Sequence, residues 1–236
     1  MSEKTPLYYR YHFVFENDHA VDIKINLDPE TLQFIPSDKQ LAPYWARFDY
    51  LACKECQLNQ KGGSFCPVAV NIASVIEAFK DAYSYDVVDV TVETQDRMYA
   101  KLQVPIQQPL SSLLGIIMVT SGCENLDKLR PMAKYHLPFA SIEETIYRAT
   151  SMYLLAQYLR YKKGLKPDWD MTELVDIYDN IDRINANLCK RLQEASKKDA
   201  SLNAVVILDV FAQMMSTSFE YTLKDFEYLF APYLQQ

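Results

Sequence analysis

The sequence predicts an α+β fold, with an N-terminal antiparallel sheet and one packed helix followed by a C-terminal helical bundle. First, apolar and polar residues alternate in short runs through the first third of the chain, which is the pattern of half-buried strands. Second, apolar residues follow a helical period from residue 109 onward. Third, 49% of the 236 residues are hydrophobic, which suffices for a sizeable core. We therefore expect a β-rich region at 1–108 and a helical bundle at 109–236, as two units or as one continuous domain.

Short runs rich in β-branched and aromatic residues predict the strands of the sheet. The first two lie at 8–15 and 21–25, on either side of a turn signal, and a brief third run covers 32–35. Residues 45–51 are expected to form a fourth strand that ends at Cys53.

The β-rich region is predicted to contain one helix and to close with a hairpin. Pro67 fits the first position of a helix, because its missing N–H is not needed there, and an apolar stripe extends this helix to Phe79. Alternating valines at 88–92 and alternating apolar residues at 98–104 then predict two strands joined by a turn.

The bundle is predicted to begin with a short apolar helix. Ser111 or Ser112 can cap its N-terminus, and Gly122 ends it. A second helix begins at the capping box formed by Ser141 and Glu144. Its surface is apolar nearly all round, so we expect this helix to be central and buried.

Two further helices are predicted to form an antiparallel hairpin. The first starts at Thr172 and carries an apolar stripe with alternating steps of three and four residues. The stripe comprises Leu174, Ile177, Ile181, Ile184 and Leu188. It is expected to pack on the second helix, which starts at Asp199, because sequence-adjacent helices are usual neighbours. The side chains expected to point inward from the second helix are Val205, Val206, Val210, Phe211, Met214 and Met215.

Charge and apolar segments limit the classes of partner. The balance of 24 basic and 31 acidic residues gives a net charge of −7, and no basic tract is present, so we expect no nucleic-acid binding. The N-terminus has no apolar signal core, and the longest apolar stretch, at 113–119, is too short to cross a membrane. We therefore expect a cytoplasmic protein without membrane contact. The aromatic tail at 226–234 offers a surface for a protein partner or a homodimer.

Three cysteines form a candidate metal site. Cys53 and Cys56 are a C-x2-C pair, whose turn holds two thiolates at a spacing that suits a metal ion. Cys66 follows after nine intervening residues and would stand at a helix N-terminus, where the dipole and free N–H groups favour a thiolate. In a reducing compartment these cysteines are more readily metal ligands than disulfides. We predict a bound metal ion, with zinc as the leading choice.

A structural zinc ion needs a fourth ligand. Cys123 is the leading candidate, because it follows a helix that ends in glycine and is otherwise hard to place. His136, His12 and His19 are its rivals. Cys189 stands apart on the helix that bears the stripe, and we expect it to be a packing or surface residue rather than a ligand.

Two function hypotheses from different classes use the same cysteines. The leading one is a non-enzymatic binding or regulatory protein whose zinc site is structural. The competing one is a thiol-based or iron–sulfur redox protein, because a C-x2-C pair can cycle between dithiol and disulfide and thiolates also hold iron–sulfur clusters. A nucleophile–base pair of Cys123 and His136 has no local support. With no P-loop, dinucleotide-binding, hydrolase or metalloprotease motif in the sequence, we assign no catalytic residue.

Three runs of the sequence resemble an uncharacterised bacterial protein family, a domain of unknown function. They are TSGCENLDKLRPMA at 120–133, TSMYLLAQY at 150–158 and DASLNAVVILD at 199–209. The C-x2-C-x9-C spacing and the N-terminal strands are also similar to that family, so the resemblance covers most of the chain. It implies a bacterial, cytoplasmic origin and supplies no activity, substrate or catalytic residue.

Overall fold

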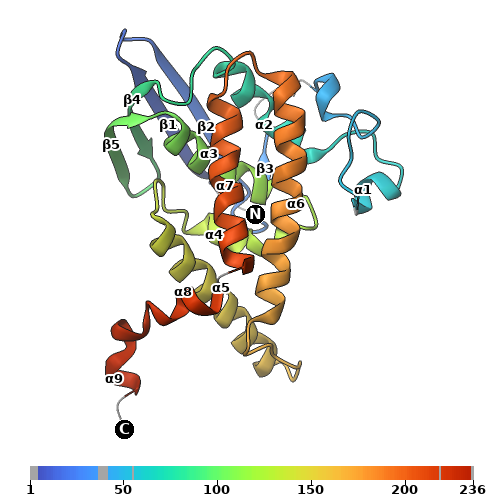
Figure 1. Cartoon of the computed structure of the whole chain (residues 1–236), viewed down its shortest axis with the longest axis vertical. Helices are drawn as coiled ribbons and strands as arrows, with labels where there is room; N and C mark the ends of the chain where they lie inside the picture. The colour runs from blue at the N-terminus through green and yellow to red at the C-terminus, as the bar shows by residue number, and fades with distance from the viewer. Residues whose placement is uncertain (1–4, 37–41, 55, 218, 235–236) are drawn as a thin grey trace.

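The computed structural model describes residues 5–36, 42–54, 56–217 and 219–234, without the side chains of 220–222. It confirms the α+β fold, with a five-stranded antiparallel sheet followed by helices (Figure 1). The strand order is β3-β2-β1-β4-β5. The strands are β1 (Leu7–Phe15), β2 (Ala20–Leu27), β3 (Phe34–Ile35), β4 (Val87–Glu93) and β5 (Met98–Pro105).

One face of this sheet is buried, as the period-two pattern predicts. In β1, Tyr9, Tyr11 and Phe13 point to the core, and alternate valines of β4 do the same. Phe13 meets the ring of Phe79 at 4.9 Å, just after helix α2 (Pro67–Ala78), which was predicted from Pro67. The buried residues of the sheet and of the helices form one contiguous hydrophobic cluster, in which the sheet rests on α2 and α3 (Gln107–Thr120).

The strand predicted at 45–51 is wrong. Tyr44–Ala46 form a single 3₁₀ turn, η1, followed by turns. The backbone is satisfied locally, because the N–H groups of Ala46 and Arg47 donate to carbonyls three residues earlier. The only ladder-like pairing described for this segment is an isolated bridge between Arg47 and Phe65. The segment therefore anchors the cysteine loop rather than extending the sheet.

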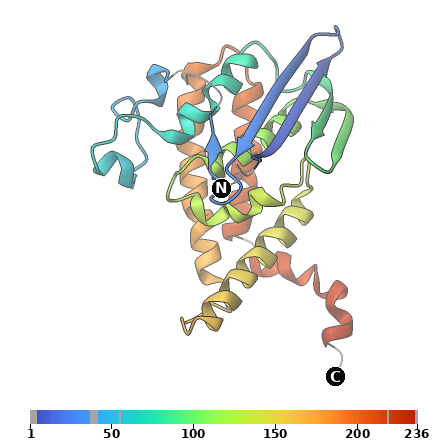
Figure 2. The same ribbon diagram turned by 180° about the vertical axis from the view of Figure 1, so that it is seen from behind.

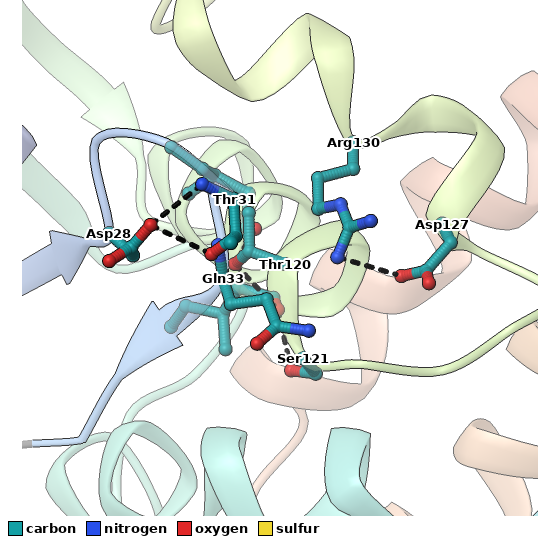
Figure 3. A network of polar contacts seen from close by, with 9 residues as sticks. Asp28, Thr31, Gln33, Thr120, Ser121, Asp127 and Arg130 are labelled. Carbon is teal, nitrogen blue, oxygen red and sulfur yellow. Dashed lines mark hydrogen bonds and ion pairs between the residues drawn. The ribbon is translucent and has the colours of Figure 1, made fainter.

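The first bundle helix begins earlier than predicted, so Ser111 and Ser112 lie inside α3 and do not cap it. Its predicted end at Gly122 is confirmed, since that residue has a φ of 77° just past the last turn. The hydroxyls of Thr120 and Ser121 donate back to carbonyls one turn earlier, at 2.7 and 2.6 Å (Figure 3). The same view shows the turn after β2, where Asp28 Oδ1 accepts the backbone N–H of Thr31 at 2.6 Å. The hydroxyl bonds of Thr120 and Ser121 satisfy carbonyls in the last turn of α3, where the chain enters the loop at 122–126.

The capping box at Ser141 and Glu144 is confirmed, with reciprocal bonds of 3.1 and 2.7 Å at the start of α5 (Ile142–Lys162). The prediction that this helix is central and buried is wrong. Leu155 is 59% exposed and Leu159 53%, while the described burial is confined to one narrow stripe of the helix. The helix lies at the edge of the bundle, so its apolar residues outnumber the positions that the core can cover.

Helices α6 (Thr172–Ala195) and α7 (Ala200–Thr217) form the predicted antiparallel hairpin. All five residues of the α6 stripe are buried. The inward assignment fails for Val206 and Val210, which are 39% and 55% exposed because α7 is covered by α6 and α3 on only part of its circumference. By length and composition alone α7 is also apolar enough to cross a membrane, and in the fold it packs between α3 and α6.

Small helical segments complete the chain: α1 (Gln57–Gln60), η2 (Asp127–Leu129), α4 (Pro131–Lys134), α8 (Phe219–Lys224), η3 (Glu227–Phe230) and α9 (Ala231–Leu234). The C-terminal tail from α8 to α9 leads away from the bundle in both views (Figures 1 and 2). Phe226 is its buried anchor and lies 6.2 Å from the ring of Tyr147 on α5. Tyr228 and Tyr233 of the tail are exposed.

Candidate metal centre

The C-x2-C pair lies in a tight turn. The backbone N–H of Cys56 donates to the carbonyl of Cys53 at 3.1 Å, and Cys56 then stands at the N-cap of α1. The loop closes behind α1 at Gly63, whose N–H donates to Leu58 O at 2.9 Å. A Cβ at Gly63 would lie 2.8 Å from that same oxygen, so this return requires glycine.

Cys66 stands at the N-cap of α2, as predicted. Its backbone N–H donates to Ala46 O at 2.8 Å, which holds the start of the helix against η1. The free N–H groups of Val68 and Ala69 act on its sulfur and lower the pKa of the thiol, whereas burial raises that pKa more strongly. The backbone is therefore arranged to stabilise a thiolate at this position once a cation compensates for burial.

Cys123 reaches the same region from the far end of α3. Its carbonyl accepts the N–H groups of Leu126 and Asp127, at 2.9 and 3.0 Å, which closes a turn around the side chain. The N–H groups of Asn125 and Leu126 lower the pKa of its thiol, and burial overrides them and raises it to about 11. An ion pair of 2.9 Å between Lys61 and Glu124 joins this turn to the C-x2-C loop.

Electrostatic interactions link the four thiols. Burial and, to a smaller extent, the neighbouring Cys66, Cys56 and Cys123 together raise the pKa of Cys53 to about 11. Cys66 and Cys56 likewise raise the pKa of Cys123. All the cysteines are free thiols. Among the described residues no group of three or more Cys, His, Asp or Glu side chains has the spacing of an assembled metal site. The four thiols therefore lie in one region without forming an assembled site. Metal binding would require their side chains to turn toward one point.

A buried arginine lies beside the thiols. Arg191 of α6 is 1% exposed, and its Nη1 donates to the carbonyls of Trp45 and Arg47, the latter at 3.1 Å. Its charge interacts with Cys66, Cys53 and Cys56, and the interaction with Cys53 lowers the pKa of that thiol. No carboxylate pairs with Arg191 among the described residues, and its Nε donates to Asn187 Oδ1 at 3.3 Å. The sequence analysis missed this residue.

The histidine rivals of Cys123 lie elsewhere. His12 is on the outer face of β1, where its Nδ1 is 3.1 Å from Asp22. His19 is in the turn between β1 and β2 and packs beside Phe15. His136 is half-buried against the inner face of the sheet, with its Nε2 2.7 Å from the hydroxyl of Tyr11. Cys189 also lies apart, on the far side of α6, where burial and the nearby Asp209 raise the pKa of its thiol to about 11.

His136 belongs to a second polar cluster, which the sequence analysis missed. Its Nε2 lies 2.7 Å from the hydroxyl of Tyr11 and 3.3 Å from that of Ser112, and the two hydroxyls are 3.1 Å apart. Desolvation in the fold and, to a smaller extent, the positive charge of Arg148 together lower the pKa of His136 to about 3. The imidazole is therefore neutral near pH 7 and bonded to hydroxyls. It is not paired with Cys123.

The neutral state of His136 makes stability depend on pH. The unfolded chain takes up a proton near the ordinary histidine pKa of 6.5, whereas the folded state resists protonation down to about 3. Stability is therefore complete above pH 6.5 and is lost progressively as the pH falls toward 3. From about pH 7.5 to 4.5 we expect His136 to contribute a loss of about 2–3 kcal/mol, measured by urea unfolding. In His136→Gln this share should vanish, while in the exposed control His19→Gln it should persist. Equal pH slopes in all three proteins would contradict the assignment.

The family described as "Domain of unknown function (DUF6901)" matches residues 8–231. The chain belongs to this family. The match to DUF6901 runs from β1 to the last tail helix and confirms the resemblance to an uncharacterised family. No curated protein and no solved structure matches the chain. The description of DUF6901 gives no ligand and no activity for the family.

Proposed function

We propose that this protein is a non-enzymatic, cytoplasmic binding or regulatory module whose fold is held by a structural zinc ion on Cys53, Cys56, Cys66 and Cys123. The observation that supports this proposal is that four free thiols from three separate segments lie in one region, where the C-x2-C turn, the Lys61–Glu124 ion pair and the bond from Cys66 N to Ala46 O join those segments. Four thiolates with no open position are the donor set of structural zinc sites.

The surroundings supply what such a site needs electrostatically. A zinc ion with four thiolates carries a net charge of about −2. Backbone N–H groups face Cys66 and Cys123, and the guanidinium of Arg191 adds a positive charge in the same region. Outer-shell donors of this kind stabilise thiolate ligands and set their orientation. The negative charge of such a zinc–thiolate centre would also give the buried guanidinium of Arg191 a partner in place of a carboxylate.

The test is metal analysis of the full-length protein purified without a histidine tag. We expect about one zinc ion per chain, as in other structural sites. Cys56→Ser should lower the zinc content and the melting temperature together, because metal binding is coupled to folding. Cys189→Ser is the matched control, since it removes a half-buried thiol outside the group and should leave the zinc content unchanged.

Full zinc content in Cys56→Ser would contradict the ligand assignment. A brown protein that contains iron and sulfide would instead support the competing redox function, in which the same cysteines hold an iron–sulfur cluster. A metal-free protein whose Cys53 and Cys56 form a reversible disulfide would support thiol redox chemistry. A zinc protein, an iron–sulfur protein and a metal-free protein differ in metal content and colour, so analysis of one preparation of the unmodified protein distinguishes them.

A further inference from the structure

A cavity of about 750 Å³ lies among the helices, and none of the five cysteines lines it. Its walls come from α3, α5, α6, α7 and the segment at 132–142. The α7 wall includes Val206 and Val210, the two residues that sequence analysis placed in the core and that the fold leaves exposed. A volume of this size, whose exposed wall is mostly apolar, is typical of sites that enclose a small organic molecule.

Two cationic side chains line the cavity. Arg148 of α5 donates through Nη2 to the carbonyls of Met132 and Tyr135, at 3.2 and 2.9 Å, and forms no salt bridge among the described residues. Lys101 also lines the wall. The one lining carboxylate, that of Glu144, accepts the backbone N–H of Ser141 in the helix cap. With His136 neutral, the lining carries a net positive charge that favours an anion.

Helix α6 contributes a row of three lining residues, Tyr178, Ile181 and Asn185, on one face of the helix. Tyr178 lies beside Arg148, whose charge lowers the pKa of its buried hydroxyl against the larger effect of burial. Asn185 is 0% exposed, and neither its Oδ1 nor its Nδ2 has a hydrogen-bond partner. A fully buried amide without partners costs free energy, so it indicates a group that binds there. The two polar points are about 10 Å apart along the helix, from its rise per residue.

We propose that this cavity binds an amphipathic organic acid, with its carboxylate at Arg148 and Tyr178, its chain along the apolar walls of α3 and α7, and a neutral hydroxyl or amide group at Asn185. The carboxylate gives the guanidinium of Arg148, which already donates to the carbonyls of Met132 and Tyr135, a partner of opposite charge. The neutral group satisfies both the donor and the acceptor of the asparagine amide. A purely apolar ligand would leave these groups unpaired, and a cationic one would face Arg148 and Lys101.

Calorimetric titration of the full-length protein with four small probes tests this assignment. We expect ω-hydroxydecanoate to bind most tightly, decanoate about fivefold to tenfold more weakly for want of the hydroxyl, and decanol about tenfold more weakly again for want of the charge. Decyltrimethylammonium should show no binding. Equal binding of decanol and decanoate, or no binding of either acid, would overturn the proposal.

Two variants separate the polar contacts. Arg148→Gln should weaken both acids about tenfold or more and leave decanol unchanged. Arg160→Gln is its matched control, because Arg160 lies on the same helix, also donates to a backbone carbonyl, at 3.0 Å, and does not line the cavity. Asn185→Leu should remove the advantage of the hydroxylated acid over decanoate without loss of melting temperature, because it eliminates an unpaired buried amide. If Arg148→Gln and Arg160→Gln behave alike, or the advantage survives in Asn185→Leu, the assigned contacts are wrong. Zinc content measured on the same variants should not change, so failure here is distinguishable from failure of the zinc site.

Discussion

Replacing Arg191 with leucine should cost about 3–4 kcal/mol of unfolding free energy. The variant leaves the carbonyls of Trp45 and Arg47 without their buried donor. It also removes the cation that faces Cys53 and Cys66. We therefore expect a lower denaturant midpoint and faster loss of zinc to a chelator, both measured on the purified variant.

Two further variants show whether the effect belongs to the guanidinium. Lys190→Leu removes a charge from the adjacent exposed position and should change stability by less than about 0.5 kcal/mol. Arg191→Lys keeps the charge but loses the planar donor geometry, so it should recover only part of the stability. If Arg191→Leu were as stable as the unmodified protein, the buried cation would have no structural role.

Leu174→Ala should destabilise the protein by about 2–5 kcal/mol, because it opens a cavity in a close-packed core. Leu174 begins the α6 stripe and is 0% exposed. Leu155→Ala is the matched comparison, since it makes the same chemical change at a helical position that is 59% exposed, where the expected loss is below about 0.5 kcal/mol. Urea denaturation of both variants measures the difference. Equal losses would mean that α5 is covered, as the sequence alone suggested.

Those two leucines show where sequence patterns succeed and where they stop. The stripe on α6 was predictable because steps of three and four residues place its members on one side of a helix. The capping box at Ser141 was predictable because both of its bonds are local. The exposure of α5 was not predictable, because an apolar helix surface does not reveal how many other helices or strands will pack on it.

The candidate site divides in the same way. The C-x2-C pair and the position of Cys66 at a helix start follow from spacing. Arg191 carried a signal that was overlooked, because it continues the α6 stripe three residues after Leu188, and a charged residue at a core position indicates a special partner. The contact of His136 with Tyr11 had no signal in the sequence, because it joins residues 125 positions apart and depends on how the helices cover the sheet.

The ion pair between Lys61 and Glu124 has a consequence for the order of folding. It joins segments that are separated along the chain by α2, the hairpin of β4 and β5, and α3. The entropy of closing so long a loop is paid only after those intervening elements have folded and brought the ends together. We therefore expect the region around Cys123 to fold late, after the segments that carry Cys53, Cys56 and Cys66. A metal ion bound at that last step would slow unfolding more than it speeds folding, because its bonds would be absent from the transition state.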